Sequence, residues 1–395
     1  GVLDERYINK EYEIEIPIRL IEVGSGTAPN ELEASDIKVY VGGELVTPTI
    51  QELELELNLI SDNRTTRVKT YTKHYVLVLK GIEKDGYLSI EIASGAVNDE
   101  VGNTNETKTY EPYTELADGS TSKIYVDNTI PRLVMTDASV TGTVTEDTEI
   151  ELKFKLTDLG AGIREDQFTI DDVKVQVDGV TVTDVTMVLI PDGSNNYETA
   201  LGGDVPSNYT YTLKLSGVKE SGTLRIAVDA NQIIDKANNG NEHLTIPTGI
   251  IIDNEGPKIG ELIVKNLDEH GRIVDDPVDM IISNCTDASG IKEYIWEYSP
   301  NGTDWIQIKV DENSGPESEL KHQLEENGDY YFRVTVVDKL GNETTSNVVK
   351  VEYSNAQKRK PTIRFETEQK YIEDFLSLPG MLYSKRCNME NPKET

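Results

Sequence analysis

The sequence predicts an all-β chain of tandem β-sandwich domains arranged as a rod. Three observations lead to this prediction: apolar and polar residues alternate in short runs, Gly- and Asn-containing turn signals separate the runs, and long stretches repeat at a fixed spacing. Alternation with a period of two is typical of strands that have one face on a core and one in water. Many short strands with regular turn signals favour a β-sandwich.

The internal repeat has a constant offset of 136 residues, the distance from Asp36 to Asp172. Residues 36–39 (DIKV) recur as residues 172–175 (DVKV), and residues 75–82 (YVLVLKGI) recur as residues 211–218 (YTLKLSGV). The offset is unchanged from about residue 12 to about residue 103. The sequence therefore predicts two copies of one domain.

Each copy ends in an Asp-Asn-x-x-Pro segment, at residues 127–131 and again at residues 253–257. Proline cannot donate a ladder hydrogen bond, and it restricts the preceding residue to extended conformations. We therefore expect the last strand to stop here and the chain to enter the next domain stiffly.

A third, shorter unit follows. Residues 287–291 (DASGI) echo residues 158–163 (DLGAGI), and residues 338–342 (DKLGN) echo residues 99–103 (DEVGN). The predicted domains are residues 1–128, 129–254 and 255–353, with a tail or the start of a further domain over residues 354–395.

The strands follow from the alternation in each unit. Runs of this kind occupy residues 14–20, 150–156 and 331–336. Pro17 in the first run predicts an edge strand, because proline removes a ladder donor. The turn signals between runs are Gly42-Gly43, Asp85-Gly86, Asp178-Gly179, Ser221-Gly222, Asn301-Gly302 and Asn327-Gly328.

Residues 354–395 break this pattern. A basic cluster at residues 358–360 precedes residues 362–365 (TIRF), which we expect to open another strand. Apolar residues at helical spacing then occupy residues 371–376, up to Pro379-Gly380. A helix that docks on a partner is the alternative to a simple tail.

Residues 1–353 resemble tandem immunoglobulin-like repeats of bacterial surface proteins. The resemblance rests on residues 94–103 (SGAVNDEVGN), on the turns after Asp158 and Asp287, and on the Asp-Asn-x-x-Pro junctions. The third unit resembles fibronectin-like domains through residues 296–305 and 328–334. The resemblance implies a fold shared by adhesins, fibre proteins and accessory modules of cell-wall enzymes, and an extracellular or cell-surface location.

The composition limits the partners. The chain has 71 acidic and 38 basic residues, which give a net charge of −33 at pH 7. Such a charge argues against nucleic acid and against anionic membrane surfaces. No apolar run approaches the roughly 18 residues of a membrane span, so we expect no membrane insertion. The two cysteines, Cys285 and Cys387, are too few for a disulfide framework, and Cys285 is expected to be buried.

No catalytic motif is apparent in the sequence. The four histidines lie outside any H-E-x-x-H spacing, and neither a G-x-S-x-G elbow nor a P-loop is present. We therefore expect the chain not to be an enzyme and to need no cofactor, with calcium as the exception.

Calcium takes carboxylate and carbonyl oxygens from loops. The candidate ligands lie in or beside turns: Asp99, Asn103, Asp127, Asp158, Asp235, Asp253 and Asp287. Acids at the end of one unit, together with Asp158 or Asp287 of the next unit, are expected to complete a site that stiffens the rod. The alternative is that these residues cap their own turns.

Both tryptophans fall in the third unit. Trp296 is expected to fill the core of its sandwich. Trp305 is a candidate ligand-binding residue, since an exposed ring stacks on sugars.

The sequence predicts a non-catalytic structural or adhesive segment of a bacterial cell-surface or extracellular protein, acting as stalk, adhesin or fibre subunit. Expected partners are other domains or subunits of a surface assembly, and glycans. Two alternatives are a carbohydrate-binding accessory segment of a secreted hydrolase and a filament subunit assembled by strand exchange. The edge at Pro17 and the irregular terminal segments permit strand exchange.

Overall fold

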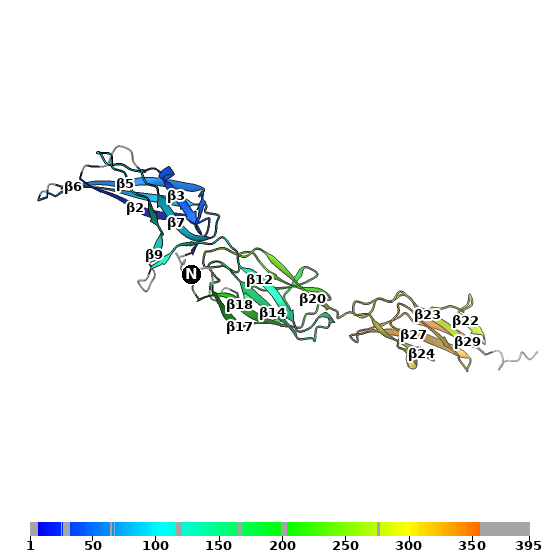
Figure 1. Cartoon of the computed structure of the whole chain (residues 1–395). Helices are drawn as coiled ribbons and strands as arrows, with labels where there is room; N and C mark the ends of the chain where they lie inside the picture. Colours follow the sequence, from blue (N-terminus) through cyan, green and yellow to red (C-terminus); the bar gives the residue numbers. More distant parts are fainter. Residues whose placement is uncertain are drawn as a thin grey trace, which may run out of the picture. The chain divides into compact units, whose positions relative to one another are not determined.

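The computed structural model describes residues 7–24, 26, 32–63, 65–66, 68–115, 121–164, 168–198, 204–274 and 277–355. The chain divides into two compact units, Gly1–Asn254 and Glu255–Thr395 (Figure 1). The described residues form strands and two 3-10 turns, η1 (Ala34–Asp36) and η2 (Ile170–Asp172). No helix in the described ranges has the length and apolarity needed to cross a membrane. The predicted all-β fold of tandem β-sandwich domains is confirmed for these residues. Beyond Asn355, the predicted tail lies outside the described residues.

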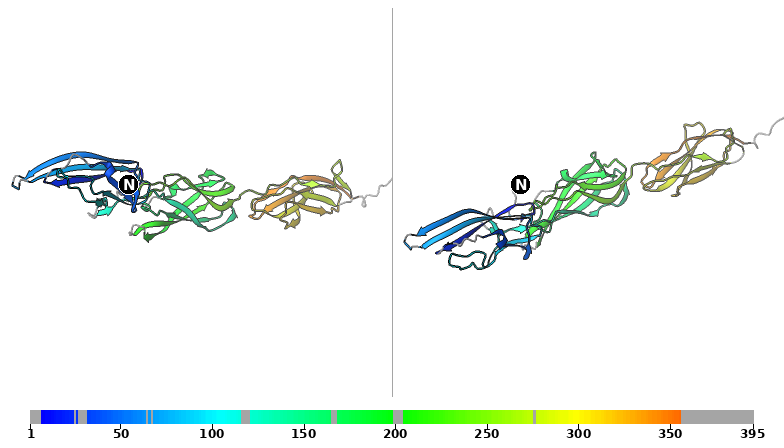
Figure 2. Two further views of the ribbon diagram at one scale, coloured as in Figure 1. Left: turned by 45° about the horizontal axis from the view of Figure 1, so that its top comes forward. Right: turned by 90° about the horizontal axis from the view of Figure 1, so that it is seen from above.

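Two sheets form the first sandwich. One has the antiparallel order β2–β6–β5, with bounds Ile14–Val23, Val68–Lys80 and Ile50–Asn63. The other has the order β1–β11–β7–β3–β4, with bounds Tyr7–Ile8, Tyr125–Val126, Gly86–Ile92, Ile37–Val41 and Glu44–Val46. Strand β8 (Lys108–Tyr110) pairs with β7, and β9 (Tyr113–Glu115) pairs with β10 (Thr121–Lys123). The long β5–β6 hairpin projects beyond the other strands of this sandwich (Figure 2).

The second sandwich repeats the plan of the two main sheets, with one more strand in the first of them. Its first sheet has the order β12–β14–β18–β17, with bounds Arg132–Ala138, Ile150–Thr157, Asp204–Ser216 and Thr186–Glu198. Its second sheet has the order β13–β20–β19–β15–β16, with bounds Gly142–Val144, Leu244–Ile252, Gly222–Val228, Lys174–Val177 and Val180–Val182. Even the 3-10 turns correspond, since η1 and η2 lie 136 residues apart and both begin with a capping box.

The second unit contains one sandwich among its described residues. One sheet has the order β21–β23–β26, with bounds Ile263–Val264, Val278–Ile282 and Ser318–His322. The other has the order β22–β29–β27–β24–β25, with bounds Arg272–Val274, Val349–Ser354, Gly328–Asp338, Ile291–Ser299 and Ile306–Asp311. Strand β28 (Glu343–Thr345) pairs with β27.

Each sandwich has its own hydrophobic core, built from the inward positions of the alternating strands. Trp296 is fully buried in the third core, as predicted, and its Nε1 donates to Ser318 Oγ at 3.2 Å. Cys285 is also buried there, as expected. Cys387 lies outside the described residues.

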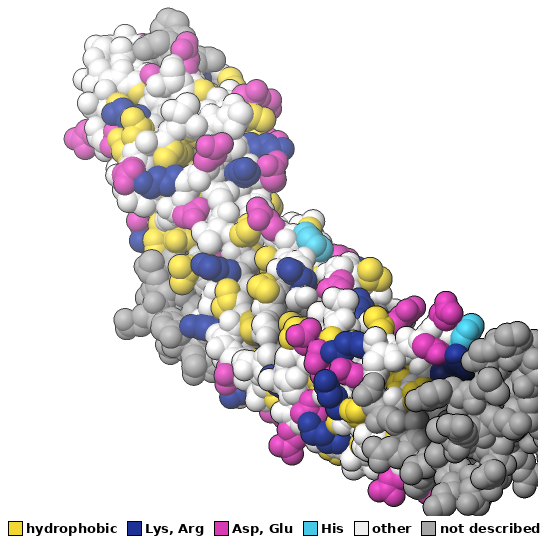
Figure 3. Space-filling model, turned by 90° about the vertical axis from the view of Figure 1, so that its right-hand side faces the viewer, with side chains coloured by type: hydrophobic (Ala, Val, Ile, Leu, Met, Phe, Trp, Pro, Cys, Tyr) yellow, Lys and Arg dark blue, Asp and Glu magenta, His cyan; other side chains and the backbone are white. Residues whose placement is uncertain are grey.

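The charged side chains lie mostly on the outward positions. On the face shown in Figure 3, acidic and basic side chains are interspersed with apolar and uncharged ones. Some pair across strands, as Lys38 Nζ does with Glu91 Oε1 at 3.1 Å. Exposed pairs of this kind contribute little to stability, so the apolar cores must hold each sandwich together.

Candidate metal centre

Asp127 directly follows β11, the last strand of the first sandwich. Its backbone N–H donates to Ile8 O at 2.8 Å, which extends the parallel pairing of β1 and β11 by one bond. Its carboxylate accepts hydrogen bonds from Thr129 N at 2.9 Å and from Ala161 N of the second sandwich. Asp127 therefore connects the end of one repeat to a loop of the next.

Asp158 directly follows β14 and starts that loop. Its two carboxylate oxygens accept from Gly160 N at 3.3 Å and Gly162 N at 2.7 Å. A side chain at Gly160 would meet the Asp127 carboxylate, because its Cβ would lie 2.1 Å from Asp127 Oδ1. The glycine allows the junction acid to approach the loop backbone.

Asp235 lies in the loop between β19 and β20, where it forms an isolated bridge with Ile163. Its carboxylate accepts two hydrogen bonds from Asn239, one from the backbone N and one from Nδ2, both at 2.8 Å. The same Asn239 amide also donates to Asp127 O at 2.8 Å. This asparagine thus links the β19–β20 loop to the junction acid.

These three aspartates converge. One carboxylate oxygen from each lies within 4.8 Å of the others, and the three side chains are almost completely excluded from solvent. The sequence predicted each of them as a calcium ligand. The structure brings these three together, and it shows that each also accepts hydrogen bonds from its surroundings.

Burial and mutual repulsion disfavour the charged forms of the carboxyl groups. Burial, followed by the charge of Asp127, raises the pKa of Asp158 to about 6. Burial also raises the pKa of Asp235 to about 7, even though the hydrogen bonds from Asn239 act in the opposite direction. The pKa of Asp127 is raised for the same reason, against the bonds from Ala161 and Thr129.

The donor set fits a hard divalent cation. All three side chains offer carboxylate oxygens, which suit calcium, magnesium and manganese rather than zinc. The three oxygens lie within 4.8 Å of one another, and oxygens at about 2.3–2.6 Å from one calcium ion lie at most about 5 Å apart. Three carboxylates at this spacing are thus close enough to share one cation.

Asp99 and Asn103, two other predicted ligands, cap their own turn. Asp99 Oδ1 accepts from Asn103 N at 2.7 Å and from Val101 N at 3.0 Å, and Asp99 Oδ2 accepts from Asn103 Nδ2 at 2.6 Å. This is the first-repeat counterpart of the Asp235 turn. The turn-capping alternative thus describes both the Asp99 turn and the Asp235 turn. Of these two described turns, the Asp235 turn is the one that lies beside a junction acid, Asp127.

Asp253 belongs to the first unit and Asp287 to the second, and each resembles its counterpart locally. Asp253 N donates to Val144 O at 2.8 Å, as Asp127 N does to Ile8 O. Asp287 Oδ1 accepts from Ser289 N at 2.8 Å and Gly290 N at 3.1 Å.

Sequence reasoning did not include Asp338 as a ligand. Its carboxylate is capped by Asn342 in the same way as Asp235 is by Asn239. The D-x-x-G-N pattern that it shares with residues 99–103 was the available signal.

Trp305, the candidate glycan-binding residue, is half-buried. The guanidinium carbon of Arg333 lies 4.1 Å from the centroid of its ring, and Arg333 Nε donates to Glu297 Oε2 at 2.7 Å. A cation–π contact of this kind occupies one face of the ring. The structure thus gives Trp305 a packing role on the outer face of β24 and β27.

Comparisons with known proteins concern the fold. No protein-family model matches the chain, and no curated protein matches it. Domains A168–A170 of titin align with 85% of this chain and 97% of their own, at 11% identity and a TM-score of 0.24.

Two bacterial structures give similar values. The fibronectin(III)-like modules of Clostridium thermocellum CbhA align with 59% of this chain and all of theirs, at 11% identity and a TM-score of 0.23. The Bacteroides ovatus protein SGBP-B, solved with a mixed-linkage heptasaccharide, aligns with 90% of this chain and 67% of its own, at 13% identity and a TM-score of 0.15. No functional conclusion follows from similarity at this level.

Proposed function

We propose that the chain is a non-catalytic structural segment of a bacterial cell-surface or extracellular assembly, and that calcium joins its first two repeats at Asp127, Asp158 and Asp235. The observation that supports this role most directly is the convergence of the three buried carboxylates at the junction. The chain would act by display and spacing of its domains rather than by turnover of a substrate.

The connectivity of the cluster supports a mechanical role. Asp127 directly follows the last strand of one repeat, whereas Asp158 and Asp235 belong to two separate loops of the next. A cation bound to all three would cross-link the end of the first sandwich to both loops. Such a link restricts bending at the junction without a disulfide, which suits a chain with two cysteines.

The electrostatics support a bound cation. Three buried carboxylates within 4.8 Å of one another repel when all are charged, which raises the free energy of the folded junction. A divalent cation removes this repulsion and replaces it with attraction. We therefore expect calcium to stabilise the folded junction by mass action, by about 2.7 kcal/mol at 100 times its dissociation constant.

The test is a calorimetric melt of the full chain in chelator and in calcium, combined with titration calorimetry. The wild-type chain should bind calcium and gain several degrees in melting temperature. In Asp158→Asn this gain should shrink strongly because a charged ligand is lost. In chelator the same variant should be more stable than the wild type, since the substitution removes one repelling carboxylate.

The matched control is Asp147→Asn, an exposed acid of the same repeat, which should keep the full calcium response. An unchanged wild-type melt in chelator and calcium would overturn the calcium proposal, as would an equal response in Asp158→Asn. The surface location is tested separately by antibody labelling of intact cells of the source organism, and absence of label on intact but not on lysed cells would contradict it.

A further inference from the structure

The three sandwiches differ at one sheet edge. In the second repeat, β12 pairs with the outer edge of β14, and in the third, β21 pairs with the outer edge of β23. The counterpart strand in the first repeat is β2, which pairs with β6 on its inner side. No described residue pairs with the outer edge of β2.

The open edge leaves apolar side chains partly uncovered. In β14, Phe154 and Leu156 are fully buried, and the buried Leu133 of β12 lies opposite Leu156. Their counterparts on β2, Ile18 and Leu20, face the core of the first repeat but are only half-buried. The first core therefore lacks the side chains that a neighbouring strand supplies in the second.

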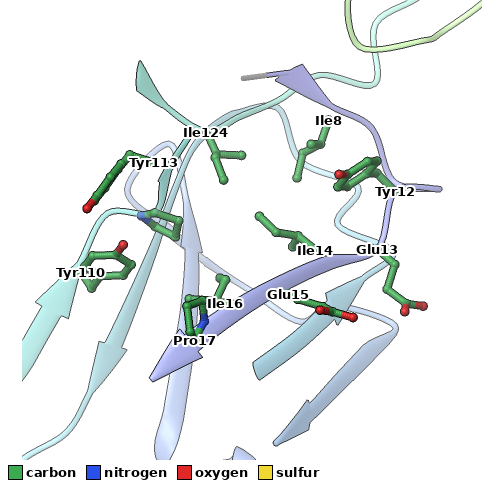
Figure 4. Close-up of a pocket in the computed structure, with 11 residues that line it drawn as sticks. Ile8, Tyr12, Glu13, Ile14, Glu15, Ile16, Pro17, Tyr110, Tyr113 and Ile124 are labelled. Carbon is green, nitrogen blue, oxygen red and sulfur yellow. The ribbon is translucent and has the colours of Figure 1, made fainter. Parts of the chain in front are cut away.

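A pocket of about 320 Å³ adjoins this edge. Ile14, Ile16 and Pro17 of β2 line one side, and Ile8, Ile124 and Tyr113 are among the residues opposite (Figure 4). In the second repeat, Ala138 pairs with Leu152, the counterpart of Ile16, and packs against the core. In that repeat the connection from β12 to β13 begins at this point.

Pro17 does not prevent strand addition. Its counterpart is Lys153, which faces Asp137 immediately after the β-bulge of β12. At a bulge the ladder is locally interrupted, so a missing N–H costs little there. The edge of β2 is thus suited to a strand that is built like β12.

The sequence contains one further segment of that kind, outside the described residues. The first strands of repeats two and three follow a proline that comes shortly after the preceding repeat ends, at Pro131 and Pro257. Pro361 also follows the last strand of a repeat: it lies seven residues after the end of β29, whereas Pro131 and Pro257 lie five residues after β11 and β20. Aligned on the prolines, Ile363 and Phe365 take the places of Leu133 and Met135, two of the residues that β12 directs at the core.

We propose that the outer edge of β2 binds residues 361–367 of a second copy of this chain as an added antiparallel strand. By the register of β12 and β14, Ile363 then lies opposite Leu20, and Phe365 lies opposite Ile18. Main-chain hydrogen bonds supply affinity and the two apolar side chains supply specificity, as in other cases of strand addition. Copies joined in this way associate head to tail. The inference is independent of the proposed calcium site.

The register makes one unfavourable pair, Arg364 opposite Arg19. Like charges directly opposite each other weaken strand pairing. Arg19→Glu should therefore tighten self-association about two- to fivefold. In contrast, the double substitution Ile363→Asp and Phe365→Asp should weaken it at least tenfold, while Phe375→Asp, an apolar tail position outside the proposed strand, should leave it unchanged.

The measurement is sedimentation of the full chain over a concentration series. Concentration-dependent oligomers that respond as stated support the proposal. A monomer at all concentrations would overturn it, as would oligomers that are indifferent to the substitutions at Ile363 and Phe365.

Disulfide trapping tests the register and the source of the strand. In a Cys387→Ser background, Ile21→Cys on one chain and Thr362→Cys on another should form a mixed dimer under oxidation, because their Cα atoms would lie about 5.5 Å apart. Pro17→Cys with Thr362→Cys is the register control, four residues out of place, and should not cross-link.

The single variants are mixed, so a covalent dimer proves that two copies are joined. No cross-link in the mixture would overturn the proposal. A chain that carries both Ile21→Cys and Thr362→Cys is the further test. If it cross-links only within itself, the chain binds its own tail, and the proposal is overturned.

Discussion

At the scale of single residues, Gly160 makes the junction between the first two repeats possible. An added Cβ would lie 2.1–2.2 Å from all three atoms of the Asp127 carboxyl group, so this carboxyl group would have to move. We predict that Gly160→Ala destabilises the first unit by about 1–3 kcal/mol, the usual cost of overpacking. Denaturant unfolding in chelator measures this. Leu159→Ala, at a neighbouring exposed residue, is the control, and equal midpoints for both variants would contradict the prediction.

His322 makes the third repeat sensitive to pH. It is half-buried and its ring centroid lies 5.4 Å from that of Tyr298, and burial lowers its pKa. The unfolded chain therefore binds the proton more strongly than the folded one does, and stability falls as pH drops through about 6.5. Both tryptophans lie in this repeat, so tryptophan fluorescence can follow its thermal unfolding between pH 7.5 and 5.5.

We predict that the melting temperature of this signal falls on acidification and that His322→Gln reduces the fall. The comparison with wild type controls for the other titratable groups of the repeat, because the variant leaves all of them unchanged. An identical pH dependence in wild type and variant would show that His322 does not contribute.

At the scale of elements, much of the fold was predictable because the side-chain period of a strand is two and the repeat offset is constant. The alternation at residues 14–20 and 150–156 corresponds to β2 and β14. Pro17 predicted that β2 lies at a sheet edge, and it does so among the described residues. The sequence did not show that the counterpart strand β14 has β12 on its outer side, because strand pairing is a long-range property. Nor did it show the β-bulge between Leu55 and Leu57.

The leucines of β5 differ in their contact with the core. Leu53 packs against it, whereas Leu59, beyond the bulge, is 48% exposed. Leu77 of the adjacent β6 is fully buried in the same core. We predict that Leu77→Ala costs about 2–5 kcal/mol and Leu59→Ala at most about 0.5 kcal/mol. Denaturant unfolding of the two variants provides a matched comparison, and similar losses would show that the end of the hairpin is covered in solution.

At the scale of the whole molecule, the candidate site was predictable only in part. Turn patterns identified Asp127, Asp158 and Asp235, but they identified Asp99 equally well, because all such turns are capped alike. What separates Asp235 from Asp99 is a neighbouring junction acid, which comes from the end of a different repeat. The order of the repeats suggested that the junction acid meets the loop acids of the next repeat. That the three carboxylates are buried and close together is visible only in the folded structure.

The net charge of −33 is also a property of the whole chain. Self-repulsion of this size disfavours the compact state, and salt screens it over a Debye length that shortens from about 10 Å at 0.1 M to about 3 Å at 1 M. We predict that sodium chloride, added in chelator, raises two melting temperatures. One is that of the tryptophan signal of the third repeat, and the other is that of the whole chain measured by calorimetry.

Calcium at constant ionic strength separates the specific effect from screening. If the acids at the first junction act only through the general field, equal ionic strengths of sodium and calcium chloride should stabilise the chain equally. We expect calcium to add to the effect of sodium in the wild type and to add much less in Asp158→Asn. A melting temperature that falls or stays constant with sodium chloride would mean that the acidic side chains are already neutralised, by partners or by bound cations that the chelator does not remove.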